Sequence, residues 1–106
     1  MLAHNVYFTL KDNSDDAKAA MVAACRKYLA DHPGTVFFAC GTRCAALNRP
    51  VNDRGFDVAL HVIFDSQAAH DRYQEAPRHH QFIAENRENW AQVRVFDSEV
   101  EGPTAA

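Results

Sequence analysis

The chain has 106 residues, 47% of them hydrophobic and 24% charged, with a formal net charge of −3. These values are typical of one small folded domain, and they exclude wholesale disorder, a strongly basic nucleic-acid-binding surface and a membrane-spanning segment. The predicted partners therefore include neither nucleic acid nor membrane. The N-terminal residues lack the basic start and apolar run of a signal peptide, which favours a cytoplasmic location.

The first half of the chain predicts a strand, a helix and a second strand. Residues 2–11 alternate in the period of a half-buried strand. Its inward positions are Leu2, His4, Val6, Phe8 and Leu10. Ser14 is a good helix cap, and the helix that follows is expected to run to about His32. The sequence "HPGT" ends it, and "TVFFACGT" is typical of a strand from about Thr35.

The second half predicts a strand, a broken helix and a last strand. The sequence "GFDVALHVIF" alternates clearly. Its inward positions are Phe56, Val58, Leu60, Val62 and Phe64. Ser66 precedes a predicted helix over 67–76, Pro77 interrupts it, and a second helical piece runs to about Trp90. The sequence "QVRVFD" closes the pattern as a strand, and residues 99–106 are expected to form a flexible tail.

This order predicts an α+β fold, the ferredoxin-like β-α-β-β-α-β plait, in a single domain over residues 1–98. Its four-stranded antiparallel sheet is expected to have helices on one side only. A domain of this size buries only part of its surface, so association of copies is an expected supplement.

The side of the sheet without helices carries a mixture of aromatic, apolar and charged residues. We expect a dimer interface there, formed by Tyr7, Asp57, His61, Ile63, Arg94 and Phe96. Two such sheets packed face to face form a homodimer, a dimeric α/β barrel. The alternative is an ordinary amphipathic sheet facing water.

The segment "YQEAPRHHQF" contains the candidate site. Helical periodicity directs Tyr73 and His79 toward the space between helices and sheet, and directs His80 to the other side. His4 opens the inward face of the first strand, so three polar groups surround an apolar chamber. The expected chamber walls are Val6, Phe8, Tyr28, Val58, Leu60, Phe82 and Ile83.

These residue types suit proton transfer. A histidine can remove a proton from carbon or oxygen, and a tyrosine hydroxyl can stabilise an enolate oxygen. The predicted catalytic residues are therefore His79 as base, Tyr73 as its partner, and His4. The alternative is a histidine that is merely hydrogen-bonded within the core. His32, His70 and His80 are weaker candidates.

Four stretches together resemble the stress-responsive dimeric α/β-barrel (Dabb) domain family: "HNVYFTLKD", "RGFDVALHVIFDS", "YQEAPRHHQF" and "VRVFD". The resemblance spans about residues 3–97 and is similar in outline to plant polyketide cyclases of the family. It implies a homodimer, a ligand chamber between sheet and helices, and an aldol-type ring closure that needs no cofactor.

The resemblance also implies site residues. A tyrosine before the helix break, a histidine after it and a histidine in the first strand match Tyr73, His79 and His4. The sequence departs from the family at two positions, since Ala76 stands where "HPAH" has its first histidine and Val58 stands where the cyclases have a third-strand histidine.

Other chemistry has little support in the sequence. Cys25, Cys40 and Cys44 include no CxxC pair, so they are expected to be reduced thiols and not zinc ligands. His79 and His80 point apart and do not share a metal. The sequence singles out neither a phosphate-binding glycine loop nor a haem or flavin site, so no metal or cofactor is predicted.

Three hypotheses remain open at this point. The first is a domain that binds a small apolar or aromatic ligand. The second is a cofactor-independent cyclase, lyase or isomerase. The third is a structural stress protein whose chamber is filled by side chains.

Overall fold

The structure, a computed structural model, describes residues 1–103. Its elements follow one another as β1 (Leu2–Leu10), α1 (Asp15–Leu29), β2 (Thr35–Thr42), β3 (Val58–Phe64), α2 (Gln67–Glu75), α3 (Pro77–Asn86), the 3-10 turn η1 (Arg87–Asn89) and β4 (Trp90–Glu99). The predicted α+β, ferredoxin-like order is confirmed, with the second helix divided at Pro77. Among the described residues, no helix is both long and apolar enough to span a membrane.

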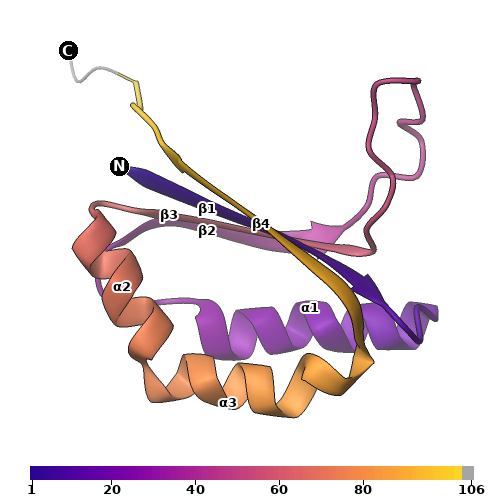
Figure 1. The fold of residues 1–106 in the computed structure, drawn as a ribbon, viewed down its shortest axis with the longest axis horizontal. Coiled ribbons are helices and arrows are strands. Elements are labelled where there is room, and N and C mark those ends of the chain that lie inside the picture. Colours follow the sequence, from indigo (N-terminus) through magenta and orange to yellow (C-terminus); the bar gives the residue numbers. More distant parts are fainter. Residues whose placement is uncertain (104–106) are drawn as a thin grey trace.

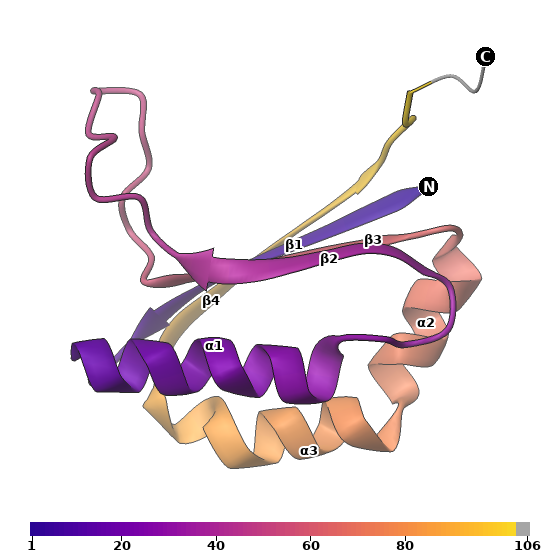
Figure 2. The same ribbon diagram turned by 180° about the vertical axis from the view of Figure 1, so that it is seen from behind.

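The four strands form one antiparallel sheet in the order β2-β3-β1-β4. All three helices lie on one side of this sheet (Figures 1 and 2). We call the side that carries the helices the inner face and the opposite side the outer face. Antiparallel pairing places His4 of β1 between Val62 of β3 and Asp97 of β4. Because paired residues project from the same face, His4 and Asp97 are neighbours on the inner face.

The hydrophobic core lies between the inner face and the helices. Its buried members are Val6, Phe8, Leu10, Met21, Cys25, Tyr28, Leu29, Val58, Leu60, Val62, Phe64, Ala69, Tyr73 and Phe82. The inward positions predicted for β1 and β3 supply half of this set, because side chains on a strand alternate between its two faces.

The first helix ends earlier than predicted. α1 stops at Leu29 and not near His32, since Asp31 has a left-handed φ of 64°. Pro33 also disfavours helical backbone at the residue before it. The buried His32 ring instead places Nε2 2.7 Å from the Tyr28 carbonyl oxygen, and so gives a hydrogen-bond partner to a carbonyl near the helix end.

The break between α2 and α3 follows the prediction. Ala76 is extended, with φ −65° and ψ 141°, and Pro77 is the first residue of α3. Proline suits this position because its missing N–H has no partner within a helix there. The break turns α3 relative to α2 and brings Tyr73 and His79 together from two helices.

The prediction for Phe56 was wrong. β3 begins at Val58, so residues 55–57 lie outside the strand and do not continue its alternation. The Phe56 ring contacts Tyr7 on the outer face, with ring centroids 4.9 Å apart. Asp57 is held by two bonds to β1: its backbone N–H donates to the Phe8 carbonyl, and its carboxylate accepts from the Leu10 N–H.

The predicted tail starts later than expected. Glu99 closes β4, and Val100 exchanges backbone hydrogen bonds of 2.9 and 3.1 Å with Met1. Residues 104–106 of the expected tail lie outside the described residues.

Candidate functional site

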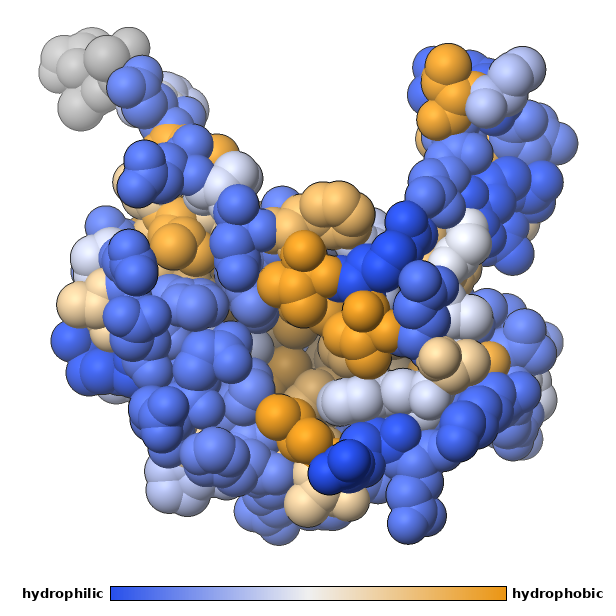
Figure 3. All heavy atoms as spheres, viewed as in Figure 1, coloured by the Kyte–Doolittle hydropathy of each residue, from blue (hydrophilic) through white to orange (hydrophobic). Residues whose placement is uncertain are grey.

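A cavity of about 340 Å³ opens between the inner face and the helices α2 and α3. It is lined by His4, Val6, Phe8, Leu29, Leu60, His70, Tyr73, Gln74, His79, Phe82, Ile83, Trp90, Val93, Val95 and Asp97. Figure 3 shows a hollow bordered by hydrophobic side chains in the middle of this view, between β4 and α3. Most of the lining is apolar, so its few polar atoms decide what the cavity can hold.

Three of those polar atoms are buried and have no hydrogen-bond partner among the described residues. They are the Tyr73 hydroxyl, His79 Nδ1 and Trp90 Nε1. The Tyr73 and His79 rings lie edge to face, with centroids 4.8 Å apart. Buried polar atoms in native proteins nearly always have partners, so three orphans lining one cavity need an explanation.

His4 has a well-defined partner. Its Nδ1 lies 2.6 Å from Asp97 Oδ1, across the β1–β4 pairing. Because a carboxylate only accepts, His4 Nδ1 carries the proton, and Nε2 of the neutral ring is free to accept one. Burial lowers the pKa of His4 below its usual value, while the hydrogen bond to Asp97 raises it. The His4 ring lies edge-on to Tyr73, with centroids 5.8 Å apart.

The protonation states of Tyr73 and His79 follow from burial. Burial raises the pKa of the Tyr73 hydroxyl well above its usual range, so this group stays a hydrogen-bond donor. Burial, reinforced by the neighbouring histidines, lowers the pKa of His79 to about 4. At neutral pH the cavity therefore holds a neutral imidazole beside a protonated phenol.

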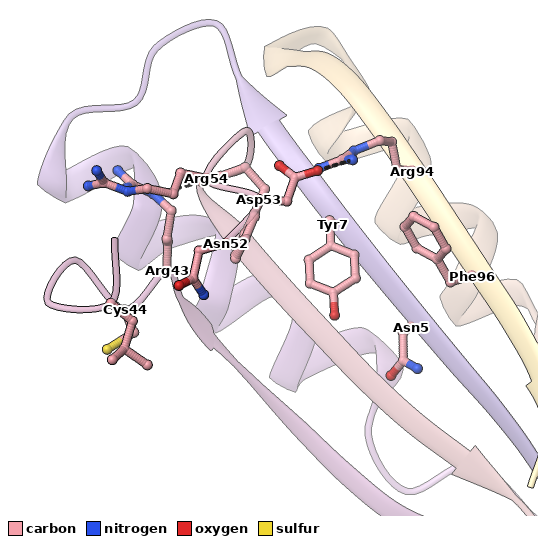
Figure 4. Close-up of a pocket in the computed structure, with 11 residues that line it drawn as sticks. Asn5, Tyr7, Arg43, Cys44, Asn52, Asp53, Arg54, Arg94 and Phe96 are labelled. Carbon is pink, nitrogen blue, oxygen red and sulfur yellow. Dashed lines mark hydrogen bonds and ion pairs between the residues drawn. The ribbon is translucent and has the colours of Figure 1, made fainter. Parts of the chain in front are cut away.

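A second cavity, of about 410 Å³, lies on the outer face. Figure 4 shows Tyr7, Arg94 and Phe96 projecting from the sheet toward residues of the loop that joins β2 to β3. Several of its polar groups are paired: Arg94 Nη1 lies 2.7 Å from the Asp53 carboxylate, and Arg43 Nε donates to the Phe56 carbonyl oxygen. Within residues 1–103, the lining of this cavity contains no buried polar atom without a hydrogen-bond partner, in contrast to the inner cavity.

The model of the "Stress responsive A/B Barrel Domain", called Dabb, matches residues 2–100. The chain belongs to the Dabb family. Among solved structures, a Dabb family protein from Mesorhizobium loti is 23% identical, with a TM-score of 0.77 over 95% of this chain and 97% of that one. No curated protein matches the chain.

Two further solved structures share the fold of this Dabb chain. A dimeric ferredoxin-like protein from Thermobifida fusca is 19% identical, with a TM-score of 0.77 over 93% of this chain and 90% of that one. A hydroxynitrile lyase from Passiflora edulis is 20% identical, with a TM-score of 0.75 over 98% of this chain and 96% of that one. At these identities the likeness shows the shared fold.

The structure of this Dabb chain brings the three predicted catalytic residues, Tyr73, His79 and His4, to one cavity. Of the predicted chamber walls, Val6, Phe8, Leu60, Phe82 and Ile83 line it. Tyr28 and Val58 do not. The Tyr28 hydroxyl donates to the Glu85 carboxylate, and Val58 is fully buried in the core. His80 is exposed, as expected.

Sequence reasoning missed several lining residues, above all Asp97, His70 and Trp90. The signal for Asp97 was present: the first and last strands of a ferredoxin-like plait pair antiparallel, which places the end of one opposite the start of the other. His70 was a weak candidate, yet its ring centroid lies 5.0 Å from that of His4.

The predicted interface residues lie in different surroundings. Tyr7, Arg94 and Phe96 line the outer cavity, and His61 Nδ1 is 2.7 Å from the Asn5 amide oxygen. Ile63 of β3 pairs with Phe37 of β2 and Ala3 of β1. The Asp57 carboxylate is already bonded to the Leu10 N–H.

Among the described residues, one group of three side chains is suited to metal binding: His4, His70 and Asp97, whose donor atoms all lie within 4.8 Å of one another. The cysteines are separate free thiols, and Cys25 is fully buried. Burial raises the pKa of the Cys25 thiol to about 12, which makes it unreactive at neutral pH.

Proposed function

We propose that this Dabb chain binds a small, largely apolar organic molecule with a carbonyl group in the inner cavity, and transfers a proton to or from it. The observation that carries the proposal is the trio of unpartnered buried atoms on Tyr73, His79 and Trp90. An unsatisfied buried polar group costs about 1–3 kcal/mol. A bound molecule with oxygen atoms at these positions removes that cost.

The polar groups divide into complementary roles. The Tyr73 hydroxyl and the Trp90 N–H are donors, suited to a carbonyl oxygen. His79, neutral because its pKa is about 4, offers a further hydrogen bond to the ligand. The apolar walls exclude water, which strengthens each of these interactions.

His4 is better suited than His79 to act as the base, although the sequence favoured His79. Asp97 orients the His4 ring and leaves Nε2 without a proton, the arrangement of a base with its orienting carboxylate. His79 has no such partner and has the low pKa of a weak base. We therefore assign proton removal to His4.

The step balances without a cofactor. The C–H bond next to the carbonyl breaks, and its proton goes to His4 Nε2. The electron pair moves to the carbonyl oxygen, and the Tyr73 hydroxyl stabilises the resulting enolate by a hydrogen bond. Enolates of this kind are intermediates in aldol-type cyclisation, lyase and isomerase reactions. The hydroxynitrile lyase among the structural neighbours supports lyase chemistry on this fold.

A proton-exchange assay tests the proposal. Acetophenone is the probe, because its methyl protons lie next to a carbonyl and their exchange in D2O can be followed by proton NMR. The protein is treated with EDTA first. We expect His4→Ala to slow the exchange about 100-fold or more, and Tyr73→Phe by a similar factor. The exposed His80→Ala is the matched control and leaves the rate unchanged.

The second candidate is a binding protein without catalysis, favoured by the burial of His4, which lowers the pKa of the proposed base. In that case the acetophenone resonances shift on binding, and Tyr73→Phe weakens the binding. The methyl protons of acetophenone, however, exchange no faster with the protein than in buffer. An exchange rate that neither His4→Ala nor Tyr73→Phe changes, together with no binding of acetophenone, contradicts both candidates.

We also infer that two copies associate through their outer faces. Phe37 and Phe96 are exposed there, at 54% and 52% of their full areas. The loop between β2 and β3 extends from the sheet on this side, away from the helices, and borders the outer face (Figure 1). The Thermobifida fusca neighbour is described as dimeric, which supports association of two copies.

A further inference from the structure

We propose that His4, His70 and Asp97 form a binding site for a divalent transition-metal ion such as zinc. The proposal goes beyond the proposed function, although the two share one cavity. The three residues come from β1, α2 and β4, so only the tertiary structure brings them together. Two imidazoles and one carboxylate are a ligand set that zinc accepts in proteins.

The distances are compatible with one ion. Donor atoms of the three residues lie within 4.8 Å of one another, and His4 Nδ1 is only 2.6 Å from Asp97 Oδ1. Two ligand atoms on a tetrahedral zinc ion lie about 3.3 Å apart, given bond lengths of about 2.0 Å. Small rotations of Asp97, whose side chain is 45% exposed, and of the partly buried His70 therefore suffice, while the buried His4 ring stays in place.

His70 is already oriented by a carboxylate. Its Nδ1 lies 3.0 Å from Asp71 Oδ1, which holds the proton on that nitrogen and leaves Nε2 as the available donor atom. Its Nε2 is 3.5 Å from the Gln74 amide nitrogen, a long contact that an ion can replace. A carboxylate bonded to the second nitrogen is the usual companion of a metal-binding histidine.

The ion replaces the proton that lies between His4 and Asp97. The N–H bond at His4 Nδ1 breaks, the nitrogen lone pair binds the ion, and the proton passes to solvent. A fourth coordination position faces the cavity, because all three ligands line it. Three protein ligands with one open position are typical of a zinc site that also binds water or a small molecule.

This binding mode has a consequence for the proposed base. A metal-bound His4 is held through Nδ1, so its Nε2 carries the proton and no longer accepts one. The ion and the proton-accepting role of His4 are therefore alternatives, and zinc is expected to slow acetophenone exchange. In His70→Ala, which keeps His4 and Asp97, zinc is expected to slow it less.

Zinc titration of tag-free, EDTA-treated and dialysed protein tests the site by calorimetry. We expect saturable binding of one ion per chain, and visible absorption bands typical of low coordination number when cobalt replaces zinc. His70→Ala should weaken zinc binding at least about tenfold. Asp97→Asn, which keeps the shape of the side chain, should do the same. Two controls should bind zinc as the original chain does. His80→Ala changes an exposed residue outside the cluster, and His79→Ala changes a residue that lines the same cavity but is not a proposed ligand.

The absence of saturable zinc binding, or equal affinity in the original chain and in His70→Ala, overturns the metal site. Its failure can be distinguished from failure of the proposed function, because the exchange assay uses EDTA-treated protein and no metal. Tyr73→Phe should lose exchange activity in EDTA while keeping zinc binding, so the two measurements fail independently.

Discussion

The two faces of the sheet differ in which groups lack a partner within the chain. On the inner face, the hydrophobic side chains of β1 and β3 are buried, whereas Val93 and Val95 of β4 are exposed at the cavity. Three polar atoms around this cavity have no partner among the described residues. On the outer face, several polar groups have partners within the chain, as Arg94 has with Asp53, while large hydrophobic side chains such as Phe96 are exposed.

The difference indicates what each face lacks. The inner face lacks hydrogen-bond partners, which a small polar-tipped molecule supplies. The outer face lacks cover for apolar area, which a second protein surface supplies. The outer cavity is the larger of the two, but its described lining residues include no buried polar atom without a partner, so size alone does not identify the candidate site.

The largest expected effect is a difference in the free energy of unfolding between substitutions on the inner face and on the outer face. Phe64 is fully buried on the inner face, and Phe64→Ala should lower the free energy of unfolding by about 3–5 kcal/mol. Phe96→Ala, on the outer face, should change it by less than about 1 kcal/mol when the chains are dilute enough to be separate. Urea denaturation measures both. A loss at Phe96 as large as at Phe64 would mean that the outer face is packed within one chain.

The next effect concerns association. Tyr7→Asp places a charge in the centre of the proposed interface, twice in a symmetric dimer, and should weaken the dimer at least about tenfold. Sedimentation velocity over a range of concentrations measures this. Ala23→Asp adds the same charge on the exposed side of α1 and should leave association unchanged. Equal sedimentation of both variants and the original chain contradicts the face-to-face arrangement.

The third comparison concerns the pH dependence of the inner face. The pKa of His79 is about 4 in the folded chain and 6.5 for the free side chain. The unfolded chain therefore binds more protons between these values, and the free energy of unfolding should fall as the pH falls from about 6.5 to about 4. Urea denaturation across this range measures the slope.

His79→Asn should make that slope shallower, because it removes one of the groups with a lowered pKa. His4, and Glu85 at the acid end of the range, contribute in the same direction. The exposed His80→Asn is its control and should retain the slope of the original chain. A slope that His79→Asn leaves unchanged would mean that this ring titrates alike in both states.

Much of the fold could be predicted because its causes are local. Alternation with a period of two assigned Val6, Phe8 and Leu60 to the inner face, and Pro77 determined where the helix breaks. The error at Phe56 has the opposite cause. Alternation carries no information about where a strand begins, and here residues 55–57 lie outside the β3 ladder.

The sequence by itself determined the class of fold, the inward direction of His4, Tyr73 and His79, and the apolar character of the space around them, because each depends on the periodicity of its own segment. Only the tertiary structure decided the chemical state of that site. Asp97 is 93 residues from His4, and strand register brings their side chains to 2.6 Å. The packing of α2 against the sheet adds His70, and burial lowers the pKa of His79. Partners and burial are properties of the assembled fold, which local periodicity does not encode.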